Sequence, residues 1–161
     1  MSIFSGINHV ALKTRDIDRS LAFYTGKLGM PEIMRLFYDD GSLFLIYLKI
    51  TDDQFIELFP EGTGERAPGP GATAVNHFCL NVENIERAVA DLQAAGVTIT
   101  REIRTGVDDN RQAWFEDPDG NRIELMQMLP EGMQFKALKE LAGGRPAIRH
   151  VTWAKRPVPV A

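Results

Sequence analysis

The sequence is poor in cysteine, in long apolar runs and in clustered basic residues, which are typical of disulfide-rich, membrane and nucleic-acid-binding proteins respectively. Cys79 is the single cysteine among 161 residues, so no disulfide can form within the chain. No apolar run approaches the roughly 20 residues of a membrane-spanning helix, and we expect no signal peptide at the N-terminus. The 18 basic residues are outnumbered by 22 acidic ones, without a basic patch typical of nucleic-acid binding. We therefore expect a cytoplasmic protein that binds neither membrane nor nucleic acid.

Hydrophobic residues make up 44% of the chain, enough for a core, and the length suits one compact domain or two small modules that share a sheet. Two halves of the sequence match one another. His9 stands in I-N-H-V-A-L, and Glu57 follows 48 residues later in F-I-E-L-F. His77 stands in V-N-H-F-C-L, and Glu124 follows 47 residues later in R-I-E-L-M. The repeat indicates a duplicated unit.

Each half has the pattern β-α-β-β-β. The first helix is predicted to begin after Asp16 and to end at Gly29, and the second to end at Gly96. The predicted strands are residues 7–13, 33–38, 42–49 and 54–59 in the first half and 75–82, 97–103, 111–116 and 121–128 in the second, with the second helix over 84–95.

These elements predict an α+β fold of two βαβββ modules that form a curved, cup-shaped sheet around a metal site. The first module spans residues 5–59, and a Gly- and Pro-rich linker spans 60–74. The second module spans 75–128. Residues 129–161 form a C-terminal extension with a short helix over 132–142.

The strand pattern places each His and Glu on the sheet face away from the helices, inside the cup. Four such groups are costly to bury unless they are paired or bind a metal. Two imidazoles and two carboxylates at matched positions therefore favour one divalent metal ion on the pseudo-twofold axis, and Ni, Zn, Co, Mn and Fe(II) all suit this ligand set. The predicted ligands are His9, Glu57, His77 and Glu124.

Further residues lie on the same faces and are candidates for binding an anionic small molecule. The candidate substrate-binding residues are Lys13, Arg122, Phe55, Phe59 and Trp114. Cys79 shares the face of His77, and we expect it to be a small buried residue rather than a nucleophile. His150, in the extension, is expected at the surface.

The sequence resembles the vicinal oxygen chelate superfamily, in particular glyoxalase I (lactoylglutathione lyase) and the bleomycin resistance proteins. The matching stretches are I-N-H-V-A-L-K at 7–13, D-I-D-R-S-L-A-F-Y-T-G-K-L-G-M at 16–30, F-I-E-L-F at 55–59, N-H-F-C-L-N-V at 76–82 and F-E-D-P-D-G-N-R-I-E-L-M at 115–126.

The resemblance implies a metal-dependent lyase or isomerase in which Glu57 and Glu124 are both ligands and catalytic residues. In glyoxalase I the metal chelates adjacent oxygens of the substrate, and a metal-bound Glu moves a proton between neighbouring carbons through an enediolate. The resemblance also implies a homodimer. Bacterial glyoxalase I typically has Arg where this chain has Lys13 and Asn where it has Glu61. Both family residues help to bind glutathione, so a different substrate is expected.

Two other functions are compatible with the sequence. A non-haem Fe(II) dioxygenase needs two His, one carboxylate and open positions for oxygen, one of which Glu57 would close. A ligand-sequestering protein of the bleomycin-resistance type does no chemistry and usually lacks the complete ligand set. The sequence leaves open the substrate, the metal, the role of residues 129–161, and whether the modules pair within one chain or between two.

Overall fold

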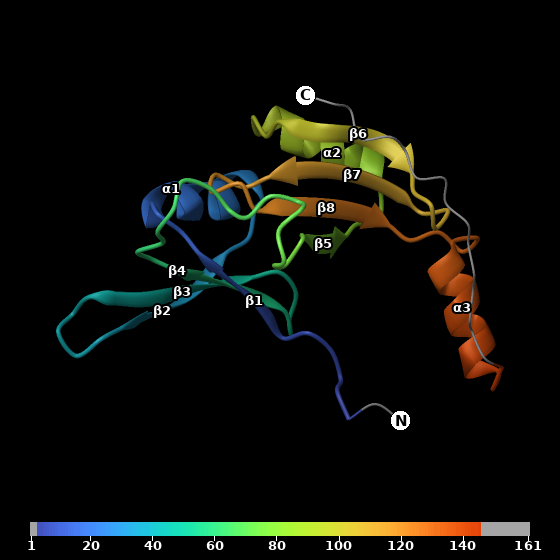
Figure 1. The fold of residues 1–161 in the computed structure, drawn as a ribbon, viewed down its shortest axis with the longest axis horizontal. Coiled ribbons are helices and arrows are strands. Elements are labelled where there is room, and N and C mark those ends of the chain that lie inside the picture. The colour runs from blue at the N-terminus through green and yellow to red at the C-terminus, as the bar shows by residue number, and fades with distance from the viewer. Residues whose placement is uncertain (1–2, 146–161) are drawn as a thin grey trace.

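The computed structural model describes residues 3–145 as two four-stranded sheets, three α-helices and one π-helical segment (Figure 1). The first sheet contains β1 (His9–Lys13), β2 (Glu32–Phe37), β3 (Leu43–Lys49) and β4 (Phe55–Phe59). The second contains β5 (Phe78–Asn81), β6 (Ile99–Thr105), β7 (Arg111–Glu116) and β8 (Arg122–Gln127). The helices are α1 (Ile17–Leu21), η1 (Ala22–Lys27, π-helical), α2 (Ile85–Ala94) and α3 (Met133–Ala142).

Both sheets have the same mixed topology, which confirms the predicted α+β fold of two βαβββ units. The strand orders are β1-β4-β3-β2 and β5-β8-β7-β6. In each sheet the first strand pairs in parallel with the last, and the other pairings are antiparallel. The first and fifth strands are therefore edge strands within the described part of the chain.

The predicted helix ends are confirmed. Asp16 caps α1 by accepting a hydrogen bond from the Arg19 amide, and Asn84 caps α2 in the same way through Arg87. Gly29 and Gly96 follow the helices with φ of 69° and 74°, a left-handed conformation that glycine adopts without strain. The pattern did not predict that the helix after Asp16 becomes π-helical at Ala22.

Two of the edge strands, β1 and β5, begin later than predicted. β1 starts at His9 rather than at residue 7, and β5 starts at Phe78 rather than at residue 75. Both differences fall at the N-terminal end of an edge strand, where the described residues offer no strand on the outer side. The alternating apolar pattern extends further in the sequence, but within one chain these residues lack the backbone hydrogen bonds to a neighbouring strand that would make them part of β1 or β5.

The hydrophobic core lies between the two sheets. It combines residues of β3 and β4, such as Ile46 and Ile56, with residues of β7 and β8, such as Phe115 and Ile123. Helical residues fill the space between them, and the Phe23 and Phe115 rings lie 6.3 Å apart. Because side chains alternate along a strand, Glu57 and Glu124 lie on the outer faces of the two sheets.

Polar contacts also join the two units. The Tyr24 hydroxyl donates to Asp117 at 2.8 Å. The hydroxyls of Thr14 and Ser20 donate to Asp119 at 2.5 and 3.0 Å. All five side chains are buried, so the turn that contains both aspartates is fixed against α1. The contacts set how the two sheets are oriented.

The predicted C-terminal helix is present as α3, which projects from the end of the second sheet (Figure 1). Among residues 3–145, no helix is both long and apolar enough to cross a membrane. His150 and the predicted surface position of its side chain lie outside the described residues.

Candidate metal centre

The first module brings together the His and Glu that the sequence predicts as its ligands. His9 begins β1, and Glu57 lies on the neighbouring strand β4. The Nε2 atom of His9 is 3.5 Å from a carboxylate oxygen of Glu57. The carboxylate is almost buried, with 8% of the side chain exposed, whereas 43% of the His9 side chain is exposed. The imidazole thus forms the open side of this first pair.

Tyr47 lies directly opposite Glu57 on β3. The pKa of Tyr47 is raised, chiefly because its hydroxyl donates a hydrogen bond to the Glu57 carboxylate. A hydrogen bond to a carboxylate stabilises the charged form. Tyr47 is therefore a polar neighbour of Glu57 on the outer face of the first sheet.

The second module repeats the arrangement. The Nε2 atom of His77 is 3.1 Å from a carboxylate oxygen of Glu124, and 7% of the Glu124 side chain is exposed. Trp114 lies opposite Glu124 on β7, and its ring packs edge-on against the His77 imidazole at 4.6 Å. Its indole nitrogen donates to Gln112 at 3.1 Å. An indole thus occupies the position that corresponds to Tyr47.

One repeated feature of the site was missed in the sequence, although I-N-H and V-N-H display it. Asn8 Oδ1 lies 3.1 Å from Nδ1 of His9, and Asn76 Oδ1 lies 2.9 Å from Nδ1 of His77. In the tautomer that donates from Nδ1 to the asparagine, Nε2 is free to bind a metal. Such outer partners orient metal-binding histidines.

The two pairs do not converge in one chain. They lie on the outer faces of the two sheets, with the shared core between them. Among residues 3–145, no three His, Cys, Asp or Glu side chains are grouped so that they could hold one metal ion. The four-residue cluster expected from the spacing is therefore divided into two halves within a chain.

Each half provides one imidazole nitrogen and one carboxylate oxygen. Two such halves supply two nitrogens and two oxygens, a donor set that suits a divalent metal of intermediate hardness. A single half supplies too few ligands for a protein metal site. The residues present therefore fit a metal that is held by two modules together.

Cys79 differs from the expectation of a buried small residue, because it is exposed on the outer face of β5. Desolvation of the thiol, together with the nearby carboxylate of Glu124, raises its pKa to about 12. A thiol that stays protonated at neutral pH is a poor nucleophile. The position therefore adds no nucleophile to the second pair.

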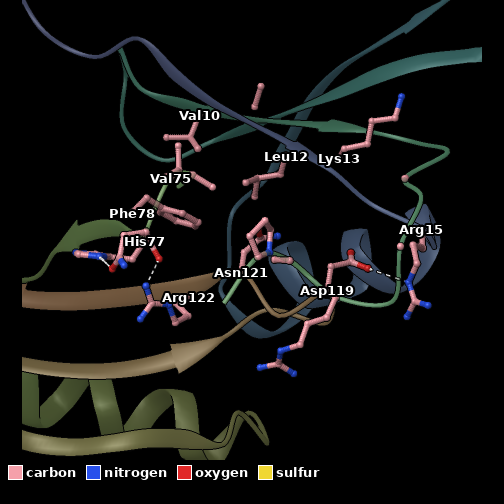
Figure 2. Close-up of a pocket in the computed structure, with 18 of the residues that line it drawn as sticks. Val10, Leu12, Lys13, Arg15, Val75, His77, Phe78, Asp119, Asn121 and Arg122 are labelled. Carbon is pink, nitrogen blue, oxygen red and sulfur yellow. Dashed lines mark hydrogen bonds and ion pairs between the residues drawn. The ribbon is translucent and has the colours of Figure 1, made fainter. Parts of the chain in front are cut away.

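A cleft of about 460 Å³ opens between β1 and the segment that leads into β5. Figure 2 shows Val10 and Phe78 on its opposite sides and the Lys13 side chain pointing away from Arg122. Arg122 donates to the backbone carbonyl of Asn76, and its Nε atom is buried without a hydrogen-bond partner among the described residues. Arg122 therefore lies beside the second pair with its Nε atom enclosed by the surrounding residues.

The other predicted substrate-binding residues are divided between the two faces. Phe55 and Phe59 flank Glu57 on β4, and both are partly exposed. Trp114 flanks the second pair, where the Arg101 guanidinium lies 5.4 Å from the centre of its ring. Aromatic walls thus border both His–Glu pairs.

Comparison with known proteins gives a consistent result. The model of the Glyoxalase/Bleomycin resistance protein/Dioxygenase superfamily matches residues 6–125. The uncharacterized protein YwkD of Bacillus subtilis is 30% identical over 127 residues, which cover 78% of this chain and 98% of YwkD. Lactoylglutathione lyase of Salmonella typhimurium is 33% identical over 131 residues, 77% of this chain and 93% of that enzyme. The crystal structure of a glyoxalase family protein from Enterococcus faecalis superimposes with a TM-score of 0.68 at 26% identity, covering 78% and 99% of the two chains.

Proposed function

Because the chain belongs to the Glyoxalase/Bleomycin resistance protein/Dioxygenase superfamily, we propose that it is a metal-dependent lyase or isomerase of the glyoxalase I type. The supporting observation is the pair of matched half-sites, each with a His Nε2 atom within 3.5 Å of a Glu carboxylate. The repeated asparagines that orient both imidazoles strengthen this proposal.

The complete centre would form between two copies of the chain, with the first pair of one copy facing the second pair of the other. If a twofold axis relates the first module of one copy to the second module of the other, β1 of the first copy runs antiparallel to β5 of the second. The segments before His9 and His77 would then gain a neighbouring strand. Their predicted but unformed strand structure supports this arrangement, as does the position of β1 and β5 at sheet edges among the described strands.

We propose different roles for the two glutamates. Bound at the centre, a divalent metal would supply electrostatic stabilisation of the oxyanion that develops when a neighbouring carbon loses a proton. Glu57 lies against the Tyr47 hydroxyl on the neighbouring strand, a polar partner that suits an anchoring role. Glu124 has an indole rather than a hydroxyl opposite it. Glu124 is therefore the better base for moving a proton between adjacent carbons, the reaction of an enediolate mechanism.

The substrate would be a small anionic carbonyl compound. Arg122 places a positive charge beside the second pair, and Lys13 places another on β1. Since Lys13 and Glu61 replace the Arg and Asn typical of bacterial glyoxalase I, we propose a 2-oxo or 2-hydroxy-carbonyl compound rather than a glutathione adduct. A lysine keeps the charge of arginine but loses its bidentate donor geometry.

The test is solvent-deuterium incorporation next to the carbonyl, across a panel of such compounds, with protein loaded separately with Ni, Zn, Co, Mn and Fe(II). We expect incorporation into at least one anionic compound. Glu124→Gln should reduce the rate by at least 100-fold, because it removes the base. Glu83→Gln, at an exposed position, is the matched control and should keep the wild-type rate.

Two results would contradict the proposal. Oxygen consumption without deuterium incorporation would assign the protein to the dioxygenases. Tight ligand binding with neither reaction would make it a sequestering protein. Efficient turnover of the methylglyoxal–glutathione hemithioacetal would retain the reaction class and refute the substrate assignment.

A further inference from the structure

The helix α3 is attached to the second sheet by a compact polar network. The Asn110 side chain is fully buried and accepts a hydrogen bond from the Leu129 amide at 2.9 Å. Its amide group donates to Asp108 and to Gln134. The Met133 amide donates to the Asp108 carbonyl at 2.8 Å. The first turn of α3 is thus fixed in direction.

Beyond this anchored turn, α3 has an apolar face that the other described residues, 3–145, leave exposed. Phe135, Leu138 and Leu141 are 48%, 59% and 61% exposed. They recur at intervals of three residues and so lie on one side of the helix. Lys136 lies on the opposite side. A helix that is held rigidly by its first turn, yet exposes its apolar face, is positioned to meet another surface.

Another exposed apolar segment lies at the start of the chain. Ile3 and Ile7 are 91% and 71% exposed, and they precede His9 without forming part of β1. Exposed apolar side chains next to an edge strand offer a surface for pairing with another chain.

The topology of the proposed centre brings these two features together across two copies. If β1 of one copy runs antiparallel to β5 of the other, with His9 beside His77, the residues before His9 lie along β5. β5 is parallel to β8, so both strands end at the same edge of the sheet, and the chain continues from β8 into α3. In Figure 1, α3 projects beyond the end of the second sheet at which β8 ends.

We propose that the apolar face of α3 packs against residues 3–7 of a second copy of the chain. This contact rests on the proposed function, because that function pairs β1 with β5 between copies. The contact covers the exposed leucines and Phe135, and it orders the segment that leads into His9. Helix α3 thereby contributes to the stability of the metal centre that the two copies share.

Disulfide cross-linking tests the contact. In a Cys79→Ser background, Ile3→Cys and Leu138→Cys are combined in one chain and oxidised at low protein concentration. We expect a covalent dimer on a denaturing gel and a matching dimer mass. Ile3→Cys combined with Lys136→Cys is the control and should give at most one-tenth of the cross-linked product, because residue 136 faces away. Sedimentation of the unoxidised protein and its metal content are measured in parallel.

Each outcome distinguishes the contact from the function. A metal-containing dimer that forms no cross-link would refute the contact and leave the proposed function standing. Cross-linked dimers that bind no metal would support the contact and contradict the function. An intrachain disulfide, with loss of thiols and no covalent dimer, would also refute the contact. A monomer at all concentrations would overturn both.

Discussion

At the scale of single residues, two aspartates in one turn have opposite pKa shifts because their partners differ. Desolvation raises the pKa of Asp117 despite hydrogen bonds from Asn121 and Tyr24. Asp119 is also subject to desolvation, but the hydroxyls of Thr14 and Ser20 outweigh it and lower its pKa. The two carboxylates should therefore affect the pH dependence of stability in opposite directions.

The folded-state pKa of Asp119 is lowered, so its stabilising contribution is present above about pH 4, the unfolded value, and is lost as pH falls through the folded value. The folded-state pKa of Asp117 is raised, so its contribution is present below about pH 4 and is lost as pH rises through the folded value. We predict that Asp119→Asn weakens the loss of stability in acid. Asp117→Asn should steepen the rise of stability with pH.

The measurement is the free energy of unfolding of each variant, from urea denaturation at several pH values between about 2.5 and 7. This is roughly the range in which carboxyl groups titrate. Asp39→Asn, at an exposed turn, controls for the charge change. Slope changes of the same sign in both variants would contradict the assignment of their environments.

At the scale of elements, the anchored first turn of α3 depends on a close approach at Gly132. A Cβ atom at this position would overlap Oδ1 of Asn110 and would lie 2.9 Å from the backbone carbonyl oxygen of Leu129. The backbone conformation there, with φ of −61°, is open to any residue, so only the steric contact requires glycine. The direction of α3 therefore depends on the absence of a side chain at Gly132.

We predict that Gly132→Ala destabilises the junction by about 1–3 kcal/mol, as overpacking of a filled site does. Hydrogen exchange of the α3 amides should become at least 10-fold faster, and Tm should fall by several degrees. Gly143→Ala is the matched control, since its nearest described contact is an ordinary 3.4 Å. Unchanged exchange in Gly132→Ala would show that the Asn110 network does not hold the helix.

Much of the element structure was readable from local signals. Asp16, Gly29 and the alternating strand pattern act over a few residues, so the helix ends and most strands were predicted. The π-helical turn at Ala22 and the late starts of β1 and β5 were not, because they depend on contacts distant in sequence. Such tertiary influences override local preference.

The candidate site was predictable in part for a related reason. The spacing within each half identified His9 with Glu57 and His77 with Glu124, and the structure brings each pair together. Because both halves carry the same motif, the sequence does not say which two halves face one another. The shared core, which places the pairs on opposite outer faces, arises from packing between modules and has no local signal.

At the scale of the whole molecule, the proposed centre can be tested by complementation between two inactive chains. His9→Ala and His77→Ala each remove one ligand from every centre of a homodimer. In a mixed dimer, one centre lacks both histidines and the other is intact. Equal mixing with free exchange should therefore restore about a quarter of the wild-type metal content and activity.

The control mixes His9→Ala with Glu57→Gln, which alter the same half-site. In that mixed dimer every centre still lacks one ligand, so no recovery is expected. Recovery in the control, or none in the first mixture after confirmed exchange of subunits, would refute a centre shared between copies.

The orientation of the two sheets, fixed by the buried contacts of Asp117 and Asp119, has a consequence for assembly size. Among the edge strands of each chain, β1 and β5 are the two that the proposed assembly pairs, and each pairs with the other kind on a neighbouring chain. Such head-to-tail complementarity closes into a ring only if the angle between the edges allows it, and otherwise propagates as an open filament. In the proposed assembly, the rigid joint between α1 and the aspartate turn sets that angle to close after two chains. The same few hydrogen bonds that stabilise the monomer would therefore also limit the assembly to two chains and prevent a filament.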